Sequence, residues 1–105
     1  MYLIRRTYRV KPGTQRKAGD ALQKIAKAYE RVGDRGPSHI YWSGGTVPGL
    51  ANHIYMDWYA EKIESPFRAD VKSAPEVSAI SKEQLYPNVE ETWIEFFQVA
   101  PPPQS

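Results

Sequence analysis

Two histidines and one aspartate are the residues of this chain best suited to proton transfer. His39 and His53 are its two histidines, and Asp57 follows the second by four positions. Histidine changes charge closest to neutral pH, and a neighbouring carboxylate orients its ring and favours the charged form. We therefore take His39, His53 and Asp57 as the candidate catalytic residues. Alternatively, the histidines make ordinary polar contacts or lie at the rim of a subunit interface, and geometry must decide between the two.

A second set of side chains could hold a planar or acidic ligand, through a guanidinium and several aromatic rings. The candidate substrate-binding residues are Arg6, Tyr8, Tyr41, Tyr55 and Trp58. Arg6 also has a structural alternative, because a half-buried guanidinium could form a salt bridge to Asp57 or Glu95. Arg5 and Arg9 lie on the other side of the same strand and could simply be solvated. The tryptophans could instead belong to the core or to a dimer interface.

Several kinds of chemistry are disfavoured by the composition. Without cysteine, the chain has no disulfide, thiolate nucleophile or cysteine-based zinc site. Two histidines and an aspartate could form a facial metal triad, but no helical or loop spacing supports one, so we expect no metal and no cofactor. The net charge of +2, with basic and acidic residues interspersed, argues against nucleic acid as a partner. No apolar run approaches the roughly 20 residues of a membrane span, and we expect a cytoplasmic protein that does not bind membranes.

The strand predicted over residues 52–60 (NHIYMDWYA) is the element on which this chemistry depends. One row of alternating side chains is apolar and contains Trp58, whereas the opposite row contains His53, Tyr55 and Asp57. A strand of this kind packs one face on a core and uses the other to line a semi-polar cavity or to contact a partner.

Three further strands are predicted over residues 2–10, 38–43 and 91–99. Residues 38–43 and 52–60 are separated by a short glycine-rich stretch and should pair as a hairpin. The hairpin would allow His39 and His53 to face the same cavity, since both stand opposite the apolar rows of their strands.

Two helices are predicted between these strands. After Thr14 as N-cap, apolar residues recur at helical spacing as far as Val32, and Gly33 follows as C-cap. The second helix begins after Ser73 and ends before Pro87. The resulting order of strand, helix, two strands, helix and strand matches an α+β fold, a ferredoxin-like βαββαβ antiparallel sheet with its helices on one face.

The strands carry more large side chains than two helices can cover. Rings left open on the second face of the sheet would form a patch beyond what monomers usually expose. At about 25 cal/mol per Å² of apolar area, burial of several rings between two subunits would stabilise a dimer by several kcal/mol. We therefore expect one domain over residues 1–99 that forms a homodimer, followed by a Pro-rich tail at residues 100–105.

The first strand also carries a family resemblance. Residues 6–13 (RTYRVKPG) resemble the R-T-Y-x-(L/V)-K-P-G start typical of NIPSNAP-type proteins, and residues 57–60 (DWYA) with 74–77 (APEV) are similar to a later part of that pattern. The resemblance implies a dimeric α+β barrel, a superfamily that includes cofactor-independent monooxygenases, haem-degrading enzymes and small isomerases. Haem-degrading members place an iron-binding histidine on a helix. Here His39 and His53 fall in predicted strands, which argues against haem degradation.

Two functions stay open on the sequence alone. The first is a homodimer whose cavity between sheet and helices binds a small aromatic or carbonyl compound, as a binding protein, a cofactor-independent monooxygenase or an isomerase. In such a reaction His53 or His39 would act as the base and Asp57 would orient it. The second is a non-catalytic dimerisation or ligand-sensing module. A cavity of suitable size that receives His39, His53 or Asp57 would favour the first.

Overall fold

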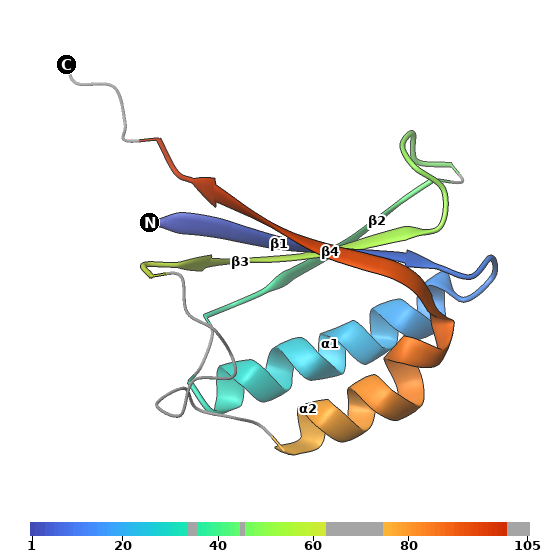
Figure 1. The fold of residues 1–105 in the computed structure, drawn as a ribbon, viewed down its shortest axis with the longest axis horizontal. Coiled ribbons are helices and arrows are strands. Elements are labelled where there is room, and N and C mark those ends of the chain that lie inside the picture. Colours follow the sequence, from blue (N-terminus) through green and yellow to red (C-terminus); the bar gives the residue numbers. More distant parts are fainter. Residues whose placement is uncertain (34–35, 45, 63–74, 101–105) are drawn as a thin grey trace.

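The computed structural model describes residues 1–33, 36–44, 46–62 and 75–100. Four strands form one antiparallel sheet in the order β2-β3-β1-β4, and both helices cover the same face of it (Figure 1). The elements are β1 (Tyr2–Val10), α1 (Gln15–Arg31), β2 (His39–Ser43), β3 (His53–Ala60), α2 (Pro75–Ile80) and β4 (Val89–Gln98). A π-helical turn (Ser81–Leu85) and a 3-10 turn (Tyr86–Asn88) connect α2 to β4. The predicted ferredoxin-like α+β fold is confirmed.

The ends of the helices follow the sequence signals, with one exception. Gly33 follows α1 with a φ of +76°, the left-handed conformation expected of a glycine at a helix C-terminus. Thr14 immediately precedes α1, but its side chain makes no capping hydrogen bond. Thr14 is thus the N-cap residue, as predicted, but its hydroxyl donates to the carbonyl of Lys11 at 2.6 Å instead of accepting from the first turn of the helix. Ser73, the predicted start signal of the second helix, and the tail beyond Ala100 lie outside the described residues.

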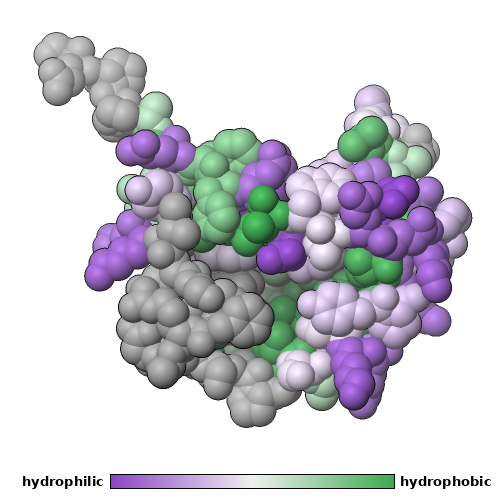
Figure 2. Space-filling model, viewed as in Figure 1, coloured by the Kyte–Doolittle hydropathy of each residue, from purple (hydrophilic) through white to green (hydrophobic). Residues whose placement is uncertain are grey.

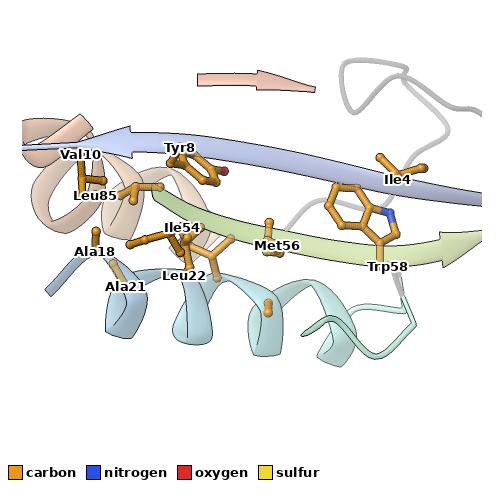
Figure 3. Close-up of a cluster of buried hydrophobic side chains, with 12 residues drawn as sticks. Ile4, Tyr8, Val10, Ala18, Ala21, Leu22, Ile54, Met56, Trp58 and Leu85 are labelled. Carbon is orange, nitrogen blue, oxygen red and sulfur yellow. The ribbon is translucent and has the colours of Figure 1, made fainter. Parts of the chain in front are cut away.

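The hydrophobic core lies between α1 and the sheet (Figure 3). Leu22 of α1 and Ile54 of β3 are both fully buried, and Figure 3 shows their side chains directed toward each other. Leu85 reaches the same core from the π-helical turn, next to Val10. The apolar row of β3 is thus fixed on the helix side, and its alternate side chains must project from the opposite face of the sheet.

One face of the sheet bears Arg5, Tyr55 and Asp57 and is covered by no helix of the described residues; it is termed the open face. Its apolar side chains include Phe97, which is 41% exposed, and Tyr59, which is 53% exposed. On the helix side of β4, Phe96 is also 44% exposed. Figure 2 shows apolar surface along β4, and the expectation of uncovered rings on the sheet therefore holds for the single chain.

The side chain of Gln15 fastens the start of α1 to the sheet. Its Nε2 donates to the backbone carbonyls of Ser43 and His53, at 2.9 Å each. These two residues are cross-strand partners at the end of the β2–β3 ladder. The amide group therefore bridges the two strands from the helix side.

We expect Gln15→Ala to lower the free energy of unfolding by about 1–3 kcal/mol, because two partly buried carbonyls lose their donor. Urea denaturation measures the change. Gln23→Ala is the matched control, since Gln23 lies exposed on the same helix, and it should change the stability by less than about 0.5 kcal/mol. Equal losses in the two variants would show that the bridge does not stabilise the fold.

Candidate functional site

Asp57 lies at the centre of the open face and is the most buried carboxylate there, with a side chain only 7% exposed. Its strand, β3, is an inner strand, so Asp57 has a neighbour on each side. Arg5 of β1 and His39 of β2 are its direct cross-strand partners. A buried carboxylate requires charged or hydrogen-bonding partners, and the two flanking strands supply them.

Three polar groups surround the Asp57 carboxylate. Arg5 Nη2 lies 3.8 Å from Oδ2, and His39 Nδ1 lies 3.5 Å from Oδ1. The Tyr41 hydroxyl donates to Oδ1 at 3.4 Å. The carboxylate thus orients the exposed ring of His39 through Nδ1, which leaves Nε2 as the nitrogen available for proton transfer.

A pocket of about 230 Å³ opens beside this cluster and is lined by Arg5, Tyr41, Tyr55 and Asp57. It is called the Asp57 pocket below. The guanidinium of Arg5 lies over the Phe97 ring, 5.8 Å from its centroid. Arg5 Nε is buried and has no hydrogen-bond acceptor among the described residues. A buried donor without an acceptor costs about 1–3 kcal/mol.

The sheet divides the eight predicted site residues between its two faces. Five lie on the open face: His39, Tyr41, His53, Tyr55 and Asp57. Three lie on the helix side: Arg6, Tyr8 and Trp58, of which Figure 3 shows Tyr8 and Trp58 within the core. One cavity between sheet and helices therefore cannot receive all eight. His39, His53 and Asp57 lie opposite the apolar rows of their strands, as predicted, and this places them on the open face and not between the sheet and the helices.

The salt bridge predicted for Arg6 is excluded by the register. Asp57 and Glu95 both lie directly opposite Arg5 in the ladders, so they are on the other face of the sheet from Arg6. Arg5, which the sequence left as a solvated residue, takes the place beside the carboxylate. Arg9 also has a partner, since it forms an exposed ion pair with Glu91 at 3.0 Å.

His53 lies on the open face but is not oriented by Asp57. The two histidines occupy opposite ends of the β2–β3 ladder, with His39 opposite Asp57 and His53 opposite Ser43. His53 is buried, and its Nδ1 lies 2.6 Å from the carbonyl oxygen of Ala51. Of the two candidate bases, His39 is the one that the structure brings to the carboxylate.

The pKa of Tyr41 is raised above its ordinary value of 10.0. The largest cause is partial burial of the phenol, and the negative charge of Asp57 and the hydrogen bond to Asp57 raise the pKa further. In the unfolded chain the phenol ionises at its ordinary pKa. The stabilisation that it contributes is therefore complete below about pH 10 and is lost as the pH rises through the folded-state pKa. We expect the wild type to lose stability above about pH 10 more steeply than Tyr41→Phe, measured by urea denaturation at a series of pH values. Parallel pH profiles would contradict this assignment.

No group of three or more His, Asp or Glu side chains is placed to hold a metal ion within the described ranges. The separation of His53 from the pair of His39 and Asp57 explains why these three do not form one. Among the same residues, no helix is both long enough and apolar enough to cross a membrane.

Comparisons with solved structures define the class of fold. No family model matches the sequence, and no curated protein matches it significantly. The fold is similar to that of solved structures of NIPSNAP domain proteins and of an antibiotic biosynthesis monooxygenase candidate. The likeness extends over essentially the whole chain.

Two of the similar structures are NIPSNAP proteins from Burkholderia xenovorans. A NIPSNAP domain protein is 17% identical with a TM-score of 0.67, and the match covers 100% of both chains. A NIPSNAP-like domain protein is 16% identical with a TM-score of 0.70, over 99% of this chain and 89% of the other. A protein from Bordetella bronchiseptica, assigned as an antibiotic biosynthesis monooxygenase, is 11% identical with a TM-score of 0.65, over 94% and 96%. At these identities the likeness speaks for the fold alone, and the NIPSNAP resemblance of the sequence is confirmed at that level.

Proposed function

We propose that two copies of this chain pack through their open faces, and that the Asp57 pocket binds a small aromatic or carbonyl compound on which it performs proton transfer. The observation that carries the proposal is the pocket itself, where a buried carboxylate meets a guanidinium and two phenols. His39 is not one of the lining residues, but its ring lies against the same carboxylate. The assignment of a structural neighbour as a monooxygenase supports a reactive role for this fold. The two NIPSNAP structures support the fold of each subunit in this proposal.

The rim of the open face supports the proposed dimer. Tyr59 and Phe97 flank the Asp57 cluster from two different strands and are about half exposed in the single chain. Packing two open faces together would bury both rings and exclude water from the Asp57 pocket. Exclusion of water strengthens the electrostatic interactions inside a site, so dimerisation would also serve the chemistry.

The proposed reaction begins with removal of a proton from a carbon next to a carbonyl group. His39 Nε2 takes the proton, Asp57 orients the ring, and Arg5 donates to the enolate oxygen. An isomerase would return the proton to another carbon of the enolate. A cofactor-independent monooxygenase would let the carbanion react with dioxygen, so that a CH₂ group becomes C=O, the second oxygen atom leaves as water, and the substrate supplies all the electrons.

Phenylacetone is a suitable probe, because it combines an aromatic ring with an acidic CH₂ group next to a carbonyl. We expect the wild-type protein to accelerate deuterium incorporation into that CH₂ group by about tenfold or more over buffer, followed by NMR in D₂O. An oxygen electrode reports in the same samples whether the enolate is oxygenated. Exchange at the buffer rate would contradict the proposed proton transfer.

The second candidate function is a non-catalytic dimerisation or ligand-sensing module. The distances of 3.4 to 3.8 Å between Asp57 and its three partners favour it, since they are longer than the hydrogen bonds of most proton-transfer sites. Phenylacetone that shifts the NMR signals of Asp57 pocket residues without deuterium exchange would support this module. Absence of both binding and exchange would contradict both candidates for this class of compound.

A further inference from the structure

Two carbonyl groups of the loop between β2 and β3 are held by side chains of the open face. The Ser43 hydroxyl donates to the carbonyl of Leu50 at 2.7 Å. His53 Nδ1 lies 2.6 Å from the carbonyl of Ala51. Because a carbonyl oxygen can only accept, Nδ1 of His53 carries a proton, and the one hydrogen of the Ser43 hydroxyl is already used.

The loop backbone is shaped for these contacts by two glycines. Gly44 and Gly49 have φ values of +93° and +141°, which other residues rarely adopt. A Cβ on Gly49 would stand 2.9 Å from the Cβ of Ser43, and a Cβ on Gly44 would stand 2.7 Å from the Cα of Ala51. Any larger residue at either position would push the loop carbonyls away from the side chains that they bind.

The hydrogen bond from Ser43 to Leu50 determines how Tyr55 meets the Asp57 pocket. Tyr55 Oη lies 3.0 Å from Ser43 Oγ. Since Ser43 has given its hydrogen to Leu50, the Tyr55 hydroxyl must be the donor in this second bond. The phenol oxygen of Tyr55 is then left with lone pairs alone for any molecule in the Asp57 pocket, of which Tyr55 forms one wall.

We infer that Ser43 is a positioning residue: held by the Leu50 carbonyl, it presents Tyr55 as a hydrogen-bond acceptor, so the Asp57 pocket selects ligands that carry a hydroxyl or N–H group. This inference rests on the proposed function and narrows its substrate class to carbonyl compounds that also carry a hydroxyl or N–H group. Tyr55 accepts the hydrogen of such a ligand, while the Arg5 guanidinium donates to a second, acceptor atom. An ether in place of the hydroxyl would set its lone pairs against those of Tyr55. Sites built to pair with a hydroxyl reject the analogue that lacks it.

The hydrogen-bond directions assigned to His53 and Tyr55 can be tested without a ligand. NMR of the full chain with ¹⁵N-labelled histidine should show neutral His53 protonated at Nδ1. With tyrosine ¹³C-labelled at Cζ, the Tyr55 signal, assigned by Tyr55→Phe, should move in Ser43→Ala and stay near its wild-type position in Ser43→Thr, which keeps the hydroxyl. Protonation of His53 at Nε2, or a Tyr55 signal unchanged in Ser43→Ala, would overturn the inference.

Selection of the ligand is tested with 4-hydroxyacetophenone and 4-methoxyacetophenone, titrated into the wild type and both Ser43 variants. We expect the wild type to bind the hydroxyl compound about tenfold or more tightly. The preference should fall to about threefold or less in Ser43→Ala, because the Tyr55 hydroxyl can then turn and donate to the ether oxygen, and Ser43→Thr should restore it. General structural damage would weaken both probes together and leave their ratio unchanged.

The outcomes separate this inference from the proposed function. A wild type without preference, or a Ser43→Ala variant with the wild-type preference, would overturn the inference even though the pocket binds aromatic compounds. If neither probe binds while the NMR results are as expected, Ser43 does make Tyr55 a hydrogen-bond acceptor toward the pocket. The proposed function then fails instead.

Discussion

An aspartate in place of Phe97 will separate the two subunits of the proposed dimer. Phe97 lies on the open face of β4, 41% exposed in the single chain and in contact with Arg5. In a two-fold dimer the substitution would place one new carboxylate in each half of the interface. Arg5 is already the partner of Asp57 and would not fully neutralise a second carboxylate. Burial of the added charge costs several kcal/mol, so we expect the dissociation constant to rise by about 10³-fold, or about 4 kcal/mol. Light scattering over a dilution series measures it.

Phe96→Asp is the matched control for this experiment. Phe96 precedes Phe97 on the same strand and is almost equally exposed, at 44%, but it lies on the opposite face of the sheet. We expect this variant to keep the subunit number of the wild type. If Phe96→Asp dissociates the protein and Phe97→Asp does not, the interface lies on the helix side of β4, and the proposed open-face dimer is wrong.

Asp57→Asn will remove most of the proposed proton-transfer activity. The substitution keeps the shape of the side chain but removes the carboxylate that lies 3.5 Å from His39 Nδ1 and orients its ring. Positioned acid–base groups contribute about 10² to 10⁴ in rate, and we expect the accelerated exchange of phenylacetone to fall by about 10²-fold or more, to the buffer rate where that is reached first. The same NMR assay in D₂O measures the change.

Glu91→Gln is the control for the loss of a carboxylate. Glu91 belongs to the same face of the sheet and is paired with Arg9, but its side chain is 58% exposed and lies outside the Asp57 pocket. We expect exchange at the wild-type rate. Wild-type exchange in Asp57→Asn, or an equal loss in both variants, would exclude a specific role of Asp57 in proton transfer.

The sequence alone predicts the order of strands and helices and which side chains share a face of each strand. The period-two row of residues 52–60 predicts which side chains of β3 meet the helices, because burial of one face fixes the other. The helical spacing that ends at Gly33 likewise predicts α1 and its buried side, since an apolar stripe and a C-terminal glycine act locally. Patterns of this kind report local periodicity and need no knowledge of the partners.

The sequence alone does not predict which residues are neighbours across adjacent strands. Arg5 and Arg6 differ by one position, and one position exchanges the two faces of a sheet. The strand pattern places Arg6 with Ile4 and Tyr8, which is correct, but the acidic partners predicted for Arg6 lie on the other face of the sheet. Comparison of the two faces of β1 with those of β3 could have favoured Arg5 as the neighbour of Asp57. The contacts of Ser43 with the loop depend on glycine backbone angles that no periodicity encodes.

The most direct test of the open-face dimer is the mass of the unmodified protein in solution. Sedimentation equilibrium at micromolar concentration should give twice the chain mass of 12.0 kDa. In such a dimer the aromatic rim of the open face is buried between the subunits. A species of 12.0 kDa at that concentration would leave the Asp57 pocket open to solvent and would contradict the account.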